Sequence, residues 1–245
     1  MTLTDTFRAL HHQGTFVMPN PWDRGSARIL EDLGSKALAT TSAGFARSIG
    51  KNDQQVTRDE LVAHVAELTS VLEIPLNVDS ERLFPDDPGG ITETVRLLAQ
   101  AGAAGCSIED YRPATGSILP VAEAAAAVAE AAAACAGHGM VLTARCENLL
   151  YGAGDLADTI ARLVAYREAG AEVLYPPGLV EAADISRVVT EVGAPVNVLA
   201  FPGSPPIDQL AGLGVRRVST GGALQTNAYK AMRHDAEALL ALQPE

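Results

Sequence analysis

Three acidic residues near the middle of the chain have the types and spacing to hold a divalent cation. Asp79 and Glu81 follow one short apolar run, and Glu109 ends the next. If the first run continues as a strand, the side chains of Asp79 and Glu81 point to the same side. Mg²⁺ prefers oxygen ligands and keeps several waters, so one or two direct carboxylates suffice while the others hold waters. No His or Cys accompanies them in a ligand-like pattern, which disfavours zinc. We predict a Mg²⁺ site at Asp79, Glu81 and Glu109, with Mn²⁺ as the alternative ion; the competing interpretation is that these acids cap helices or pair with arginines.

Two further features suit an anionic ligand. Arg145 ends a later apolar run, and its planar guanidinium can take a carboxylate through two parallel hydrogen bonds. The alternative is a structural ion pair with Glu109 or Glu147. The segment Thr41-Ser42-Ala43-Gly44 offers hydroxyls and backbone N–H groups to a second anionic group, unless it is a plain turn.

The elements that must position these side chains follow a repeating pattern. A helical stretch repeatedly ends at a glycine, as at Gly34, Gly102, Gly170 and Gly214, and a short apolar run follows. Glycine just past a helix end is a common cap, because it adopts a left-handed conformation without strain. Eight such runs are predicted as strands: Phe16–Asn20, Ala37–Ser42, Leu76–Asp79, Cys106–Glu109, Met140–Arg145, Val173–Pro176, Val196–Ala200 and Arg217–Thr220.

Helical patterns alternate with these runs. One begins at the capping-box sequence Thr57-Arg58-Asp59-Glu60. The others cover Gly25–Leu33, Ile91–Ala101, Val121–Ala136, Leu156–Gly170, Ala182–Val192, Ile207–Leu213 and Ala223–Leu242. Strict alternation predicts a parallel α/β sheet. Eight units in 245 residues favour a single (β/α)8 barrel of the TIM type, as one domain over residues 1–245. The active site of such a barrel lies at the carboxyl ends of its strands, where the acids and Arg145 fall.

Composition narrows the classes of partner and the cellular location. Thirty acidic residues against eighteen basic ones give a net charge of -12, which argues against non-specific binding to nucleic acid or anionic membranes. No apolar run approaches the ~20 residues of a membrane span. Three cysteines without a CxxC pair, and an N-terminus without signal-peptide features, predict a reducing, cytoplasmic location.

The order and spacing of these motifs resemble the isocitrate lyase/phosphoenolpyruvate mutase superfamily over nearly the whole chain. Val78-Asp79-Ser80-Glu81 resembles its metal-binding D-x-D/E. Asp53 matches a loop aspartate that reaches the site in that superfamily. The other matching segments are Asn20-Pro21-Trp22-Asp23, Thr41-Ser42-Ala43-Gly44-Phe45-Ala46, Ser107-Ile108-Glu109-Asp110, Ala144-Arg145-Cys146-Glu147-Asn148, Val173-Leu174-Tyr175-Pro176-Pro177-Gly178 and Asn197-Val198-Leu199-Ala200.

The resemblance implies a phosphoenolpyruvate/pyruvate-like barrel that acts with Mg²⁺ on a small 2-oxo acid through an enolate. It implies catalytic roles for Asp53, Glu109 and Arg145. It implies substrate contacts from Thr41, Ser42, Ala43, Gly44, Asp79, Arg145 and Asn197. It also implies a homo-oligomer, either a dimer or a tetramer, because superfamily members often exchange their eighth helix between subunits.

One departure from the superfamily bears on the reaction. The lyases carry a K-K-C-G-H loop after the fourth strand, whereas this chain has Tyr111-Arg112-Pro113-Ala114-Thr115-Gly116-Ser117. Isocitrate and methylisocitrate lyase activities are therefore disfavoured. We predict a C–C lyase or decarboxylase of an oxaloacetate-like 2-oxo dicarboxylate. A hydrolase or a phosphonate (C–P) enzyme is one alternative, and a non-catalytic 2-oxo acid binding protein is another. Tyr111, Tyr175 and a water on the metal remain open as the proton donor.

Overall fold

Parallel strands form the inner ring of the computed structural model, which describes residues 2–200 and 202–242. Within these residues, each predicted apolar run overlaps one parallel strand, and β4 begins one residue before its predicted run. The strands are β1 (Phe16–Met18), β2 (Leu38–Ala39), β3 (Leu76–Val78), β4 (Gly105–Glu109), β7 (Val141–Arg145), β8 (Val173–Tyr175), β9 (Asn197–Leu199) and β10 (Arg217–Ser219).

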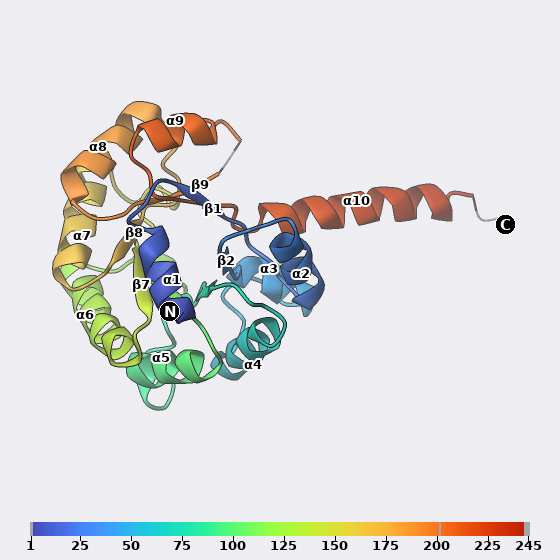
Figure 1. Ribbon diagram of the computed structural model, residues 1–245, viewed down its shortest axis with the longest axis horizontal. Coiled ribbons are helices and arrows are strands. Elements are labelled where there is room, and N and C mark those ends of the chain that lie inside the picture. The colour runs from blue at the N-terminus through green and yellow to red at the C-terminus, as the bar shows by residue number, and fades with distance from the viewer. Residues whose placement is uncertain (1, 201, 243–245) are drawn as a thin grey trace.

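The strands belong to two parallel sheets, in the orders β1-β10-β9 and β2-β3-β4-β7-β8. Two contacts join the sheets into a ring. The Ala39 N–H of β2 donates to the Pro19 carbonyl, just after β1, at 3.1 Å. At the other seam, Leu174 of β8 forms a parallel bridge with Val196, just before β9. The predicted (β/α)8 barrel is therefore confirmed, with the ring of strands inside a ring of helices (Figure 1).

The predicted helices are present, and most of them wrap the outside of the ring (Figure 1). Thr57 and Glu60 form the predicted capping box at the start of one of them, α4. Gly139 ends another, α6, with a φ of 70°. The helices that follow the strands are α2 (Arg24–Asp32), α4 (Arg58–Thr69), α5 (Gly90–Gln100), α6 (Val121–His138), α7 (Leu156–Glu168), α8 (Ala182–Val192), α9 (Ile207–Gly212) and α10 (Ala223–Leu240).

Two helices and a hairpin were not predicted. Helix α1 (Leu3–Leu10) precedes the barrel, α3 (Ser42–Ser48) follows β2, and β5 (Tyr111–Arg112) pairs with β6 (Ser117–Ile118) as a hairpin after β4. The prediction that a strand extends to Ser42 was wrong. The strand ends at Ala39, because the Thr41 hydroxyl accepts a hydrogen bond from the Gly44 N–H and caps α3 instead.

The buried core has two parts. Apolar residues between the strands and the outer helices form the larger cluster, for example Leu142 of β7 with Leu163 of α7. A smaller cluster lies inside the ring and contains Phe7 of α1 together with Phe16 and Val173, the first residues of β1 and β8. Helix α1 therefore closes the amino end of the barrel and leaves ligand binding to the carboxyl ends of the strands.

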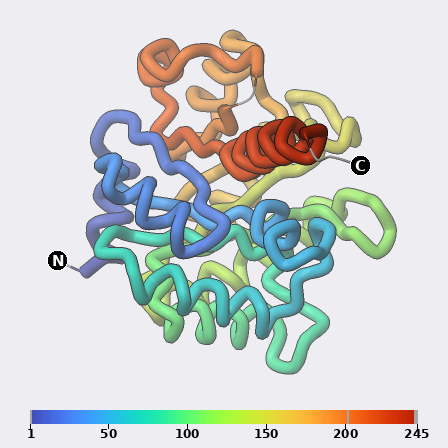
Figure 2. The backbone as a smooth tube through the Cα atoms, turned by 90° about the vertical axis from the view of Figure 1, so that its right-hand side faces the viewer, coloured from blue at the N-terminus to red at the C-terminus, as the bar shows by residue number. Residues whose placement is uncertain are grey.

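Helix α10 differs from the other helices, because it extends away from the barrel (Figure 1) and is seen nearly end-on in Figure 2. Gln225 is its one buried residue among those described. Met232, Leu239 and Leu240 are exposed large hydrophobic side chains on this helix. Within residues 2–200 and 202–242, no helix combines the length and apolar character that crossing a bilayer requires.

Candidate functional site

A cavity of about 530 Å³ opens at the carboxyl ends of the strands. Its wall combines strand ends with the start of α3 and the first turn of α10. Its lining includes Thr41, Ser42, Ala43, Asp53, Asp79, Arg145, Tyr175, Asn197, Arg217 and Ser219. Of the residues that sequence analysis singled out, the structure thus brings Asp53, Asp79, Arg145 and Asn197 to one cavity, together with Thr41–Ala43.

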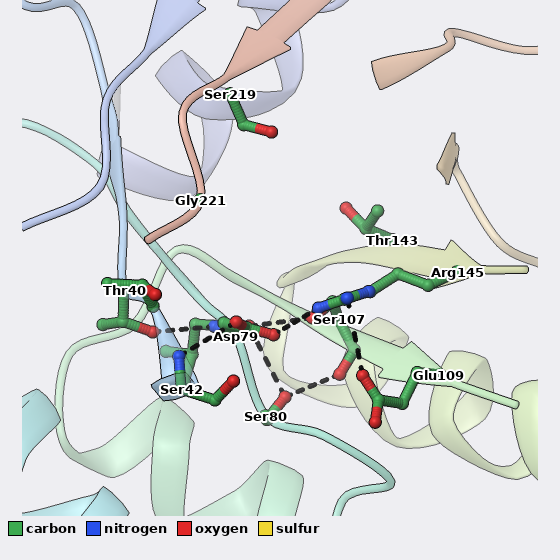
Figure 3. Close-up of polar contacts among 12 residues, drawn as sticks. Thr40, Ser42, Asp79, Ser80, Ser107, Glu109, Thr143, Arg145, Ser219 and Gly221 are labelled. Carbon is green, nitrogen blue, oxygen red and sulfur yellow. Dashed lines mark hydrogen bonds and ion pairs between the residues drawn. The ribbon is translucent and has the colours of Figure 1, made fainter. Parts of the chain in front are cut away.

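Asp79 lies at the centre of the polar contacts (Figure 3). Its carboxylate accepts a hydrogen bond from the Ser42 N–H at 3.0 Å and another from Arg145 Nη1 at 2.6 Å. Its own backbone N–H donates to the Thr40 hydroxyl at 2.8 Å. The partners of Asp79 come from two other βα units, those of β2 and β7, so the barrel holds the Asp79 carboxylate from both sides.

Arg145 is surrounded by carboxylates. Besides Asp79, its Nε donates to Glu147 Oε1 at 2.7 Å, and its Nη2 lies 3.6 Å from Glu109 Oε2. The structural ion pairs considered as the alternative for Arg145 are therefore present. Strand register explains the contact with Glu109, because Glu109 and Arg145 are partners across β4 and β7, whereas Glu147 lies two residues further along the chain. Register also makes Arg145 the partner of Tyr175 across β7 and β8. The guanidinium lies 5.2 Å from the centre of the Tyr175 ring, and Arg145 still lines the cavity.

The acidic side chains near Arg145 outnumber the positive charges that could neutralise them. Burial, together with the charges of Asp79 and Asp53, raises the pKa of Glu81 to about 8. Burial also raises the pKa of Glu109, although Arg145 opposes the shift. Burial and the charge of Asp79 raise the pKa of Asp53. Gln54, which sequence analysis missed, donates from Nε2 to Glu109 Oε1 at 2.8 Å.

These donors fit a hard divalent cation, because they are carboxylate oxygens whose mutual repulsion a cation would relieve. Among the described residues, no group of three His, Cys, Asp or Glu side chains converges tightly enough to hold a metal directly. The condition under which Asp79 and Glu81 would share one side of a strand, continuation of the strand through both, is not met. Strand β3 ends at Val78, and Glu81 has a φ of 49°, which turns the chain away. The residues therefore suit an ion with one or two direct carboxylates and several waters.

The Thr41–Gly44 segment is the first turn of a helix. Two of its N–H groups already have protein partners, because Ser42 donates to Asp79 and Gly44 to the Thr41 hydroxyl. Gly44 is buried, and a Cβ there would lie 2.5 Å from Thr41 Cγ2, so a larger residue does not fit. The segment thus positions Asp79, while its contact with a substrate remains a prediction for Ser42 and Ala43, which line the cavity.

Asn197 connects to a buried cation that sequence analysis missed. Its Nδ2 donates to the Ser219 hydroxyl at 2.9 Å, and its Oδ1 accepts from Arg217 Nε at 3.0 Å. Arg217 is 2% exposed, and its guanidinium also contacts the neutral side chains of Thr143 and His11. An arginine within an apolar run, at a position that points into the barrel, was the signal that could have identified it.

Comparison with known proteins gives a consistent answer. The family described as phosphoenolpyruvate phosphomutase matches residues 7–240. An uncharacterised protein of Mycobacterium tuberculosis H37Rv is 34% identical over 237 residues, which cover 96% of this chain and 88% of that protein. The 2-methylisocitrate lyase of Escherichia coli K12 is 29% identical over 86% of this chain and 74% of its own length. The oxaloacetate decarboxylase of Marinomonas sp. is 26% identical over 94% and 82%, respectively.

Two solved structures show the same fold. A Burkholderia cenocepacia protein, provisionally described as a lyase/mutase, is 48% identical, with a TM-score of 0.91 over 96% of this chain and 87% of that one. Phosphonopyruvate hydrolase in complex with oxalate and Mg²⁺ is 22% identical, with a TM-score of 0.88 over 100% and 92%. At that identity the second likeness concerns the fold alone.

Proposed function

This chain belongs to the phosphoenolpyruvate phosphomutase family, within the isocitrate lyase/phosphoenolpyruvate mutase superfamily, and on that premise we propose that it is a Mg²⁺-dependent carbon–carbon lyase. Its proposed reaction is the decarboxylation of an oxaloacetate-like 2-oxo dicarboxylate. The observation that carries the proposal is the pairing of Arg145 with Asp79 and Glu109, beside a cavity that Asp53, Asp79 and Arg145 line and that is large enough for a small acid.

Asp79 and Glu109 would hold the metal directly or through its waters. Glu81 and Asp53 would add negative charge near the cation. When bound, Mg²⁺ would polarise the 2-oxo group and stabilise the negative charge of the enolate. Arg145 would orient the substrate carboxylate from the face that it presents to the cavity, because Asp79 and Glu147 hold its guanidinium in place. Asn197 and Ser42 would contact the rest of the substrate, since both line the same cavity.

Decarboxylation is favoured over isocitrate-type cleavage by the hairpin after β4. The segment from Tyr111 to Ile118 contains no Cys, Lys or His, which the lyases of the superfamily have in their loop. Loss of CO₂ from a 2-oxo acid needs mainly stabilisation of the enolate charge, so it tolerates this loop. The curated oxaloacetate decarboxylase of Marinomonas sp. supports the same choice.

The test combines calorimetric titration with a product assay. Oxaloacetate and 2-oxoglutarate are titrated with Mg²⁺, with Mn²⁺ and with EDTA, and pyruvate release from oxaloacetate is measured above the rate with Mg²⁺ alone. We expect metal-dependent binding and pyruvate release by the protein. Asp79→Ala should abolish both, whereas Asp86→Ala, at an exposed position in the same loop, should retain both.

Two other results would change the proposed reaction or the proposed metal site. Metal-dependent binding without pyruvate release would argue against a decarboxylase and for a hydrolase, a phosphonate enzyme or a binding protein. A panel of 2,4-dioxo acids and phosphonopyruvate would distinguish these three alternatives. Full activity in Asp79→Ala would overturn the metal assignment.

A further inference from the structure

The cavity lacks several of the side chains that commonly donate protons in enzymes. No Cys, His or Lys is among its described lining residues. All three cysteines are buried and face other partners: Cys106 Sγ lies 3.5 Å from Cys135 Sγ, and Cys146 Sγ donates to Asn148 Oδ1 at 3.1 Å. Tyr175 is the one phenol among those lining residues. An enolate formed in this cavity therefore has few candidate acids within reach.

Tyr175 is held firmly at the carboxyl end of β8. It is 9% exposed, its carbonyl accepts the Cys146 N–H at 2.9 Å, and its ring lies beside the Arg145 guanidinium. Burial raises the pKa of Tyr175 to about 12, so the phenol keeps its proton at neutral pH. By contrast, Tyr111 is outside the cavity lining and stacks on Tyr151, with the ring centres 3.9 Å apart.

Polar side chains connect the surroundings of Tyr175 to a cation. The Ser219 hydroxyl, which lowers the pKa of Tyr175, accepts a hydrogen bond from Asn197 Nδ2, and Asn197 Oδ1 in turn accepts from Arg217 Nε. Arg217 is buried without a carboxylate partner among the described residues, which is costly for a charged group. A phenolate at Tyr175 would lie between Arg217 and Arg145, and both cations would stabilise it.

From this arrangement we propose that Tyr175 is the general acid that protonates the enolate carbon, with Ser219, Asn197 and Arg217 as its positioning residues. The proposal rests on the proposed function. The C–C bond to the departing carboxylate breaks, its electron pair forms the enolate, and CO₂ leaves. Tyr175 Oη then gives its proton to that carbon, a C–H bond forms, and the phenolate regains a proton from water.

The reverse of this proton transfer gives a test that does not depend on the identity of the substrate. In D₂O with Mg²⁺, the phenolate should remove C3 protons of pyruvate, so their signal in the proton NMR spectrum decays. We expect the rate to rise with pH, to fall on the order of 100-fold in Tyr175→Phe and to persist in the matched control Tyr111→Phe. Oxalate, a planar mimic of the enolate, should bind Tyr175→Phe within about threefold of the unmodified protein, since one such proton transfer, not ligand binding, is lost.

Ser219→Ala tests the positioning chain. Loss of the Ser219 hydroxyl, which lowers the pKa of Tyr175, should move the pH dependence of exchange upward, and Ser219→Thr should restore it. An unchanged pH dependence in Ser219→Ala would show that Ser219 does not position Tyr175.

The two proposals can fail separately. If the unmodified protein does not bind oxalate with Mg²⁺, the proposed function fails. If it binds oxalate but does not exchange pyruvate protons, or if Tyr175→Phe exchanges them at the unmodified rate, the role of Tyr175 is overturned while the proposed function stands.

Discussion

The Asp79 carboxylate and the Arg145 guanidinium meet at 2.6 Å across the mouth of the barrel, although 66 residues separate them in the chain. Strand β4 lies between the strands that carry them, and its last residue, Glu109, faces the same guanidinium. One buried cation therefore balances several carboxylates, and the site depends on that balance both for stability and for any ligand it holds.

Replacing Arg145 should expose this dependence. Arg145→Gln leaves Asp79, Glu109 and Glu147 without their cation in a largely buried site, so we expect a loss of about 3–5 kcal/mol in the free energy of unfolding, measured with urea at pH 7. Arg187→Gln is the control, because its ion pair with Glu191 is exposed and screened by solvent, so its loss should change the free energy of unfolding far less. Equal losses in the two variants would contradict this account of the site.

Two glycines should respond in opposite directions to substitution by alanine. A Cβ at Gly105, the first residue of β4, would lie 2.7 Å from the Val141 carbonyl and 2.8 Å from Phe7 Cε1. The strand backbone cannot move aside cheaply, so we expect Gly105→Ala to cost about 1–3 kcal/mol. Gly137 lies in α6 with nothing near its Cβ position, and Gly137→Ala should stabilise by about 0.5–1 kcal/mol. Urea unfolding of both variants checks the signs.

Acid should destabilise the protein through His11. Burial, followed by the nearby Arg217 charge, lowers the pKa of His11 to about 3, below its ordinary value of 6.5. Between these values the unfolded chain binds a proton that the folded protein refuses, so stability is present above pH 6.5 and falls as the pH drops toward 3. The slope of unfolding free energy against pH over this window should be smaller in His11→Gln. It should be unchanged in His12→Gln, since His12 is exposed.

Helix α10 should mediate the proposed homo-oligomer. Met232, Leu239 and Leu240 recur at helical spacing on a helix that extends from the barrel, and an exposed apolar face of this kind favours a partner. We expect a dimer or tetramer in sedimentation velocity, and a shift toward monomer in Met232→Asp/Leu239→Asp. Leu33→Asp, at a residue 78% exposed in a loop of the barrel, should leave the assembly intact. A monomeric unmodified protein would contradict the prediction.

Local sequence patterns determined the order of the elements. The capping box at Thr57 and Glu60 and the glycine at position 139 act over a single helical turn, so their effect can be predicted without the rest of the fold. The apolar runs likewise report burial on both faces of a parallel strand. Because parallel strands place their carboxyl ends at one edge, the sequence also determined that Asp79, Glu109 and Arg145 would gather at one mouth.

Tertiary structure decided which of these groups contact one another. Barrel closure and strand register, rather than spacing, join Arg145 to Asp79 and place Tyr175 beside Arg145. The turn at Glu81 depends on its left-handed backbone, which the strand pattern did not predict. Arg217 contacts His11 across 206 residues, because α1 folds back beneath the barrel. Contacts of this kind depend on distances set by the whole ring, and no local pattern of residues contains them.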